Sequence, residues 1–119
     1  MSKVLAVDDT RALRNMLAAC LKKGGHEVIM ASDGEEALSQ LRKHKPDIVI
    51  TDLNMPRMNG LEFIEAARRT PEGQSLPILL LTTETAQALK DKAREVQATG
   101  WLTKPFDPRH ILNLVSQLA

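Results

Sequence analysis

Five polar residues of this 119-residue chain stand at or just after the ends of short apolar runs. Asp8 and Asp9 follow the first run, Asp52 follows the third, Thr82 ends the fourth, and Lys104 comes soon after the fifth. In open α/β sheets, ligands bind beyond the carboxyl ends of the strands. If the runs are strands of one parallel sheet, these side chains meet at a single edge and form a charged site.

The chemistry of such a site follows from its charges. Three carboxylates held together disfavour one another's ionisation unless a cation compensates. Ligation by oxygen alone, without His or Cys, favours Mg²⁺ or Mn²⁺ over zinc. A carboxylate is a weak nucleophile toward phosphorus. A metal and a lysine ammonium would assist it by neutralising the negative charge on the oxygens of an incoming phosphoryl group. The residues therefore predict a Mg²⁺ site at Asp8, Asp9 and Asp52, with Asp52 as phosphoryl acceptor beside Lys104.

Each of these residues also has a simpler interpretation. Paired acids after a strand cap the following helix in many proteins, and the run Asp52-Leu53-Asn54 is compatible with an ordinary turn. A lysine before proline, such as Lys104, is commonly solvated surface. It is the joint placement at strand ends that favours the functional interpretation.

The elements that position the site are predicted from hydrophobic periodicity. Five apolar runs alternate with segments whose apolar residues recur at helical spacing. Continuous apolar runs are typical of strands buried on both faces of a parallel sheet, and this alternation favours right-handed βαβ crossovers. We therefore expect an α/β fold with a doubly wound, five-stranded parallel sheet. The expected strands are Val4–Val7, Val28–Ala31, Ile48–Thr51, Ile78–Leu81 and Trp101–Thr103.

Helix boundaries are predicted from capping signals. Ser32, with a glutamate three residues later, predicts a capping box at the start of the second helix, and Asp107 before Pro108 predicts the start of the last. The third helix is expected to begin near Gly60. The fourth, which has the thinnest apolar stripe, is expected over residues 85–98.

Length and composition limit the classes of function. The chain fits one domain over residues 1–119, with no room for an output domain. A net charge of +1 gives no electrostatic reason to expect nucleic acid or a membrane as partner. No segment matches a signal peptide or a membrane span, so a cytoplasmic location is expected. The single Cys20 lies on an apolar stripe and is interpreted as core filler.

The motifs resemble those of bacterial response-regulator receiver domains, in particular the single-domain chemotaxis regulators. The resemblance covers the whole chain. It rests on Val7-Asp8-Asp9, on Thr51-Asp52-Leu53-Asn54-Met55-Pro56 with Asn59-Gly60, on Thr82 and on Lys104-Pro105-Phe106. It implies a flavodoxin-like sheet of strand order 2-1-3-4-5 with five helices.

The resemblance also implies roles for individual residues. Asp52 would accept a phosphoryl group from a sensor histidine kinase, and Lys104 would contact the phosphate. The Mg²⁺ ion would be held by Asp8, Asp9, Asp52 and the main-chain carbonyl of Asn54.

The resemblance assigns further residues to switching and to hydrolysis. Thr82 and Trp101 would form the switch, although the family usually has Tyr or Phe in place of Trp101. Asn54 and Glu84 would tune hydrolysis of the aspartyl phosphate. The chain would promote only its own phosphorylation and dephosphorylation and would not be an enzyme in the usual sense.

The expected function is that of a monomeric chemotaxis response regulator acting on a flagellar motor switch protein. One alternative is a phosphorelay intermediate that passes its phosphoryl group to a histidine phosphotransfer protein, or a sink that drains a shared kinase. A metal-dependent phosphohydrolase is an alternative of another class. Such enzymes commonly have an acid-base Asp two positions after the nucleophile, where this chain has Asn54. A phosphorylation-independent interaction module would not need the acidic site.

Overall fold

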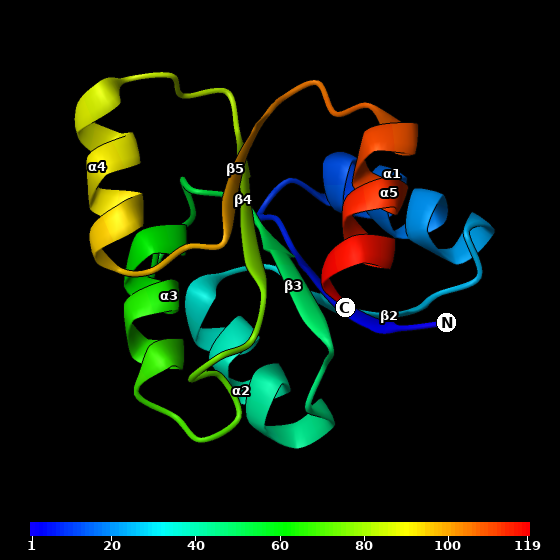
Figure 1. The fold of residues 1–119 in the computed structure, drawn as a ribbon, viewed down its shortest axis with the longest axis horizontal. Helices are drawn as coiled ribbons and strands as arrows, with labels where there is room; N and C mark the ends of the chain where they lie inside the picture. Colours follow the sequence, from blue (N-terminus) through cyan, green and yellow to red (C-terminus); the bar gives the residue numbers. More distant parts are fainter.

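The computed structural model describes residues 1–119 and contains five strands that alternate with five helices (Figure 1). All strand pairs are parallel, and the strand order is β2-β1-β3-β4-β5. The predicted doubly wound fold and its strand order are therefore confirmed. The elements are β1 (Lys3–Val7), α1 (Arg11–Lys23), β2 (Glu27–Ala31), α2 (Gly34–His44), β3 (Ile48–Thr51), α3 (Gly60–Arg68), β4 (Ile78–Thr82), α4 (Gln87–Glu95), β5 (Gly100–Thr103) and α5 (Pro108–Leu118).

The helices cover the two faces of the sheet in unequal numbers. Figure 1 shows α2, α3 and α4 on one side and α1 and α5 on the other. Alternate residues of β1 enter the two cores: Leu5 joins the cluster that contains Phe63, and Val4 joins the cluster that contains Leu17. The central strands β3 and β4 are buried along their whole length, which explains their unbroken apolar sequence.

The register of the central strands fixes where their polar ends lie. Val7 of β1 is paired with Thr51 of β3, so Asp8 and Asp52 follow at the same level of the sheet. On the other side of β3, Thr51 is paired with Leu80 of β4. The carboxyl ends of three neighbouring strands therefore deliver their polar residues to one edge.

The predicted starts of α3 and α5 are confirmed. Asn59 and Glu62 form a reciprocal capping box at the start of α3. Asp107 caps α5 through the N–H of Arg109, and Pro108 is the first helical residue.

The predicted start of α2 and the predicted limits of α4 are wrong. Asp33, not Ser32, caps α2, because the Asp33 carboxylate accepts the N–H of Glu36 at 2.8 Å. The α4 helix spans only Gln87–Glu95 rather than 85–98. Its C-terminal end is set by Gln97, whose φ of 67° is incompatible with a right-handed helix.

The prediction that Cys20 fills the core is also wrong. Leu17 and Leu21 of the same stripe are buried, whereas Cys20 is only half-buried and Met16 is 58% exposed. The apolar stripe of α1 is therefore wider than its contact with the sheet. Separately, none of the helices combines the length and apolar character that crossing a bilayer requires.

Candidate functional site

The structure brings three carboxylates together at the carboxyl edge of the sheet. One carboxylate oxygen from each of Asp8, Asp9 and Asp52 lies within 4.8 Å of the others. Asp8 and Asp52 are buried, at 3% and 8% exposure, whereas Asp9 is exposed. The cluster is thus buried at Asp8 and Asp52 and faces solvent at Asp9, which leaves it open to an incoming group.

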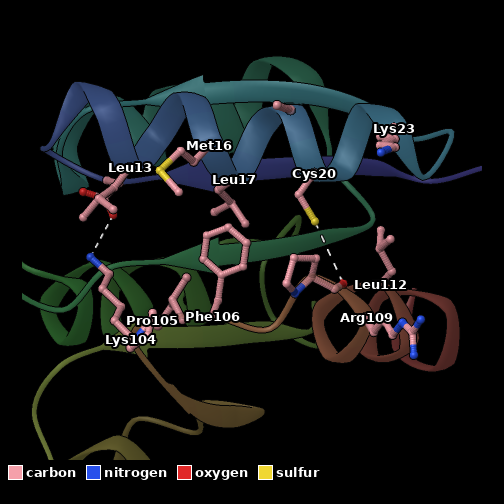
Figure 2. Close-up of a pocket in the computed structure, with 14 residues that line it drawn as sticks. Leu13, Met16, Leu17, Cys20, Lys23, Lys104, Pro105, Phe106, Arg109 and Leu112 are labelled. Carbon is pink, nitrogen blue, oxygen red and sulfur yellow. Dashed lines mark hydrogen bonds and ion pairs between the residues drawn. The ribbon is translucent and has the colours of Figure 1, made fainter.

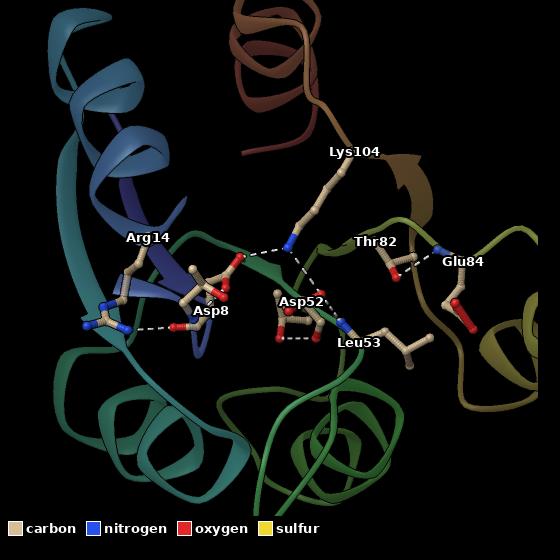
Figure 3. A network of polar contacts seen from close by, with 9 residues as sticks. Asp8, Arg14, Asp52, Leu53, Thr82, Glu84 and Lys104 are labelled. Carbon is tan, nitrogen blue, oxygen red and sulfur yellow. Dashed lines mark hydrogen bonds and ion pairs between the residues drawn. The ribbon is translucent and has the colours of Figure 1, made fainter. Parts of the chain in front are cut away.

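Lys104 reaches this cluster from the loop after β5. Its ammonium donates a hydrogen bond to Asp8 Oδ2 at 2.9 Å and lies 3.4 Å from Asp52 Oδ1 (Figure 3). The Lys104 N–H donates to the carbonyl of Thr82 at 2.9 Å, which ties the loop to the end of β4. The following peptide bond, Lys104-Pro105, is cis. One ammonium therefore lies between two carboxylates contributed by different strands.

Main-chain groups fix the orientation of the two buried carboxylates. Asp52 Oδ1 accepts the N–H of Leu53 at 2.8 Å, and Asp8 Oδ1 accepts the N–H of Thr10 at 2.9 Å. Arg14 donates to the main-chain carbonyl of Asp8 at 2.7 Å. These contacts come from the residues themselves and their near neighbours, so the local turns after β1 and β3 already orient the acids.

The surroundings of Asp52 raise its pKa above the ordinary value. Burial raises the pKa of Asp52, the neighbouring Asp8 raises it further, and Lys104 opposes both effects. One ammonium against three carboxylates leaves two negative charges uncompensated. An all-oxygen donor set with this excess charge fits a hard divalent cation such as Mg²⁺.

Asn54 and Glu84 lie on loops that flank the cluster. Asn54 is exposed, and its main-chain carbonyl accepts no backbone hydrogen bond. Glu84 is half-buried and donates its N–H to the Thr82 hydroxyl at 3.2 Å. Each residue follows a site residue, Asp52 or Thr82, by two positions, and neither side chain is hydrogen-bonded to Asp52.

Thr82 and Trp101 lie on the neighbouring strands β4 and β5. Thr82 is 1% exposed, and no hydrogen bond links its hydroxyl to Asp52. Trp101 is half-buried, is paired with Leu80 of β4, and packs against the core on the α3 and α4 side of the sheet. Its indole Nε1 is buried without a hydrogen-bond partner, and the Lys90 ammonium lies 6.0 Å from the ring centroid.

Sequence analysis missed an ion pair that supports the site. Arg57 donates to Asp33 Oδ2 through Nε at 3.1 Å and through Nη2, and Gly34 N–H donates to the carbonyl of Met58 at 3.0 Å. These contacts join the start of α2 to the loop that carries Asn54. Asp33 had a local signal, because Glu36 follows three residues later. Arg57, held at a φ of 65°, had none.

Asp33 is expected to make stability depend on pH. The N–H of Glu36 holds the pKa of Asp33 below its usual range, burial opposes this, and Arg57 adds to the lowering. Because the folded-state pKa is depressed, the stabilisation is present above the unfolded pKa and is lost as pH falls through the folded one. Asp33→Ala is expected to lower the free energy of unfolding by about 1–2 kcal/mol at neutral pH. In urea unfolding, this difference from wild type should shrink below about pH 4.

The exposed Asp91 provides a control for this prediction. Asp91→Ala is expected to change the free energy of unfolding by no more than about 0.5 kcal/mol. A difference between Asp33→Ala and wild type that stays constant down to pH 3 would contradict the assignment of Asp33 as a charged cap.

Comparison with known proteins places this geometry in a family. The model of the response regulator receiver domain matches residues 4–116. The alkaline phosphatase synthesis transcriptional regulatory protein PhoP of Bacillus subtilis is 37% identical over 92% of this chain and 45% of its own length. The chain thus spans about half the length of the first curated relatives that it matches.

Two other similarities extend over nearly the full length of both proteins. Protein PilH of Pseudomonas aeruginosa is 31% identical over 98% of this chain and 96% of its own. The crystal structure of the chemotaxis protein CheY4 of Vibrio cholerae is 44% identical, covers 100% of this chain and 99% of its own, and superposes with a TM-score of 0.94. With its fold and its family match, the chain belongs to the response regulator receiver domains, which are signalling domains of two-component systems.

Proposed function

We propose that this chain is a phosphorylation switch in which Asp52 accepts a phosphoryl group from a sensor histidine kinase. The observation that carries the proposal is the position of the Lys104 ammonium between the carboxylates of Asp8 and Asp52. In this proposal Asp8, Asp9, Asp52 and the main-chain carbonyl of Asn54 hold Mg²⁺, for which Mn²⁺ substitutes. When bound, the metal supplies positive charge to the oxygens of the transferring phosphoryl group.

In the proposed reaction, an oxygen of Asp52 attacks phosphorus and the bond from phosphorus to the kinase imidazole breaks. The nucleophile must be ionised, and the ammonium of Lys104 favours that form against the burial that raises the Asp52 pKa. As the bond forms, Lys104 exchanges part of its contact with Asp8 and Asp52 for the phosphoryl oxygens. In the same proposal Asn54 and Glu84, on the flanking loops, set the access of water that later hydrolyses the aspartyl phosphate.

The proposed switch is read out by Thr82 and Trp101. The Thr82 hydroxyl now accepts the N–H of Glu84 and has no hydrogen bond to Asp52. A phosphoryl group on Asp52 offers this hydroxyl a new acceptor, so the two states differ in their contacts, as a population shift requires. Rotation of Trp101 toward the space behind Thr82 would then alter the surface formed by α4, β5 and α5.

Thr82→Val tests this coupling without changing the shape of the side chain. The variant lacks the hydroxyl but keeps Asp52 and Lys104, so phosphorylation is expected to fall by less than about tenfold. The fluorescence change of Trp101 on adding the phosphoryl mimic beryllofluoride is expected to fall by more than half. Thr83→Val alters the exposed neighbour and serves as the matched control. A wild-type response in Thr82→Val would remove Thr82 from the switch.

The proposed target is a flagellar motor switch protein. Support comes from the similarity to the chemotaxis protein CheY4, which extends over 99% of that chain. The test is a pull-down with the beryllofluoride-treated protein as bait, in which motor switch protein should be retained more than with untreated bait. Retention of a histidine phosphotransfer protein instead would contradict the motor target and favour a phosphorelay.

The fluorescence of Trp101 tests the proposed site and switch together, because it is the only tryptophan. Adding Mg²⁺ is expected to change the emission, and beryllofluoride is expected to change it again only when Mg²⁺ is present. Asp52→Asn should abolish the second change, whereas Asp91→Asn should retain it. A response to beryllofluoride that persists in Asp52→Asn would contradict the proposed function.

A further inference from the structure

The loop between β3 and α3, residues 52–59, carries the main-chain carbonyl that is proposed as a Mg²⁺ ligand. At the base of this loop, the Gly60 N–H donates a hydrogen bond to the carbonyl of Leu53 at 2.8 Å. Asn54 follows Leu53 and is exposed, and no hydrogen bond holds its side chain or its carbonyl. The position of this carbonyl therefore depends on how the rest of the loop is held.

The tip of the loop, residues 57–58, is held by the start of α2. Arg57 donates to Asp33 Oδ2 through Nε at 3.1 Å and through Nη2. Beside this ion pair, the Gly34 N–H donates to the carbonyl of Met58 at 3.0 Å. A Cβ at position 34 would collide with that carbonyl, so the glycine allows the helix to approach the loop this closely. The tip thus depends on contacts with another element.

The main chain of Arg57 needs this support. Its φ of 65° is a left-handed conformation that residues other than glycine seldom adopt, and such a conformation persists where surrounding contacts fix it. The Arg57 side chain is 62% exposed and hydrogen-bonds to no residue other than Asp33. Asp33 is itself held in place, because it is 2% exposed and accepts the N–H of Glu36 at 2.8 Å. The ion pair therefore ties a strained residue to a fixed partner.

We propose that the ion pair of Arg57 with Asp33 positions the metal site, because it holds the loop tip and thereby the main-chain carbonyl of Asn54. The inference rests on the proposed Mg²⁺ site and assigns part of its affinity to two residues that do not touch the metal. Mg²⁺ requires near-ideal octahedral geometry, and a site that is formed only part of the time binds more weakly by that fraction. The buried Leu53 limits how far the carbonyl moves, so the effect is moderate.

Arg57→Gln tests the proposal, because it removes the charge and leaves the strained φ. Titration of the full chain with MgCl₂, followed by NMR at the Leu53 amide that donates to Asp52, is expected to show a dissociation constant raised about three- to tenfold. Arg57→Lys keeps the charge and should fall between this variant and wild type. An unchanged constant in Arg57→Gln would overturn the inference, whereas a wild-type protein that binds no Mg²⁺ would contradict the proposed metal site itself.

Arg69→Gln is the matched control. Arg69 also forms an ion pair, with Glu65 at 3.9 Å, but both side chains are exposed and lie on α3 or at its C-terminal end, away from the loop. Its loss is expected to leave the dissociation constant of Mg²⁺ at the wild-type value. An equal weakening in Arg69→Gln and Arg57→Gln would show a general effect of charge and would overturn the proposal.

A double-mutant cycle tests whether the two residues act through one contact. Asp33→Asn removes the charge but keeps an acceptor for the N–H of Glu36, so the cap of α2 remains. The double variant Asp33→Asn with Arg57→Gln is expected to bind Mg²⁺ no more weakly than Arg57→Gln alone, because the same contact is lost once. Fully additive losses of affinity would show that the residues act separately and would overturn the proposal.

A variant on the opposite face of the sheet separates positioning from loss of stability. Figure 2 shows Leu17 of α1 facing Phe106, and Leu17 is buried in the core on that side. Leu17→Val is expected to lower the melting temperature at least as much as Arg57→Gln and to leave the dissociation constant of Mg²⁺ unchanged. A dissociation constant that rises equally in both variants would show general loosening of the fold and would overturn the proposal.

Hydrogen exchange of the metal-free protein tests the loop directly. In Arg57→Gln, the Gly34 amide, which is bonded to Met58 at the tip, is expected to exchange severalfold faster. The Gly60 amide, which is bonded to Leu53 at the base, should exchange as in wild type. Unchanged exchange at Gly34 would show that the tip is held without the ion pair and would overturn the proposal.

Discussion

Asp52→Asn is expected to reduce acid-labile phosphoryl labelling by a cognate histidine kinase at least about a thousandfold, because the amide cannot act as the nucleophile. The measurement is transfer of radiolabelled phosphoryl from the phosphorylated kinase in the presence of Mg²⁺. Asp91→Asn, at an exposed position of α4, removes the same charge and should label like wild type. Wild-type labelling of Asp52→Asn would show that another residue accepts the phosphoryl group.

The same substitution is expected to stabilise the fold when metal is absent. Burial raises the pKa of Asp52 above its unfolded value, with a further contribution from Asp8. The carboxyl therefore favours the folded state below the unfolded pKa, and this advantage is lost as pH rises through the folded pKa. At neutral pH the ionised, buried carboxylate destabilises the folded state, whereas the neutral amide of Asn does not. The free energy of unfolding of Asp52→Asn should therefore exceed that of wild type by about 1 kcal/mol. A higher melting temperature also shows that the lost labelling is not caused by unfolding.

Lys104→Met is expected to separate phosphoryl transfer from metal binding. Loss of the ammonium should lower the rate of labelling about a hundred- to a thousandfold, because its charge stabilises the transferring group. Mg²⁺ should bind more tightly, because a competing positive charge 2.9 Å from Asp8 is gone. The two opposite changes are measured by kinase labelling and by Mg²⁺ titration of Trp101 fluorescence.

Two controls accompany the Lys104 prediction. Lys104→Met leaves buried carboxylates without their ammonium and should lower the melting temperature of the metal-free protein, with recovery on adding Mg²⁺. Lys92→Met removes an exposed lysine of α4 and should alter neither measurement. Weaker Mg²⁺ binding in Lys104→Met would contradict the charge balance proposed for the site.

The sequence predicted that the acids meet at one edge of the sheet, because periodicity places each of them directly after a strand. The unbroken apolar runs before Asp8 and Asp52 are typical of central parallel strands, and parallel strands end at one edge of the sheet. The register of Val7 with Thr51 then makes the two acids neighbours. That β1 and β3 are neighbours was implied by the resemblance to receiver domains, because periodicity alone does not determine the strand order.

The supporting contacts were not predictable in the same way. The ion pair of Asp33 with Arg57 joins residues 24 positions apart and requires Arg57 to adopt a positive φ, for which its sequence gives no signal. The exposed Met16 and half-buried Cys20 share a helical stripe with the buried Leu17. Periodicity identifies such a stripe but not how much of it the neighbouring elements cover, and so the exposure of Met16 is visible only in the structure.

The chemical identity of the phosphorylated residue is the most direct test of the proposed switch. Borohydride reduces an acyl phosphate to an alcohol, so treatment of the kinase-phosphorylated protein converts a phosphorylated aspartate to homoserine. Mass spectrometry of the peptides is expected to find homoserine at position 52, dependent on Mg²⁺ and absent without the kinase. Homoserine at Asp8 or Asp9, or unmodified Asp52 in protein that carries the phosphoryl label, would contradict the account.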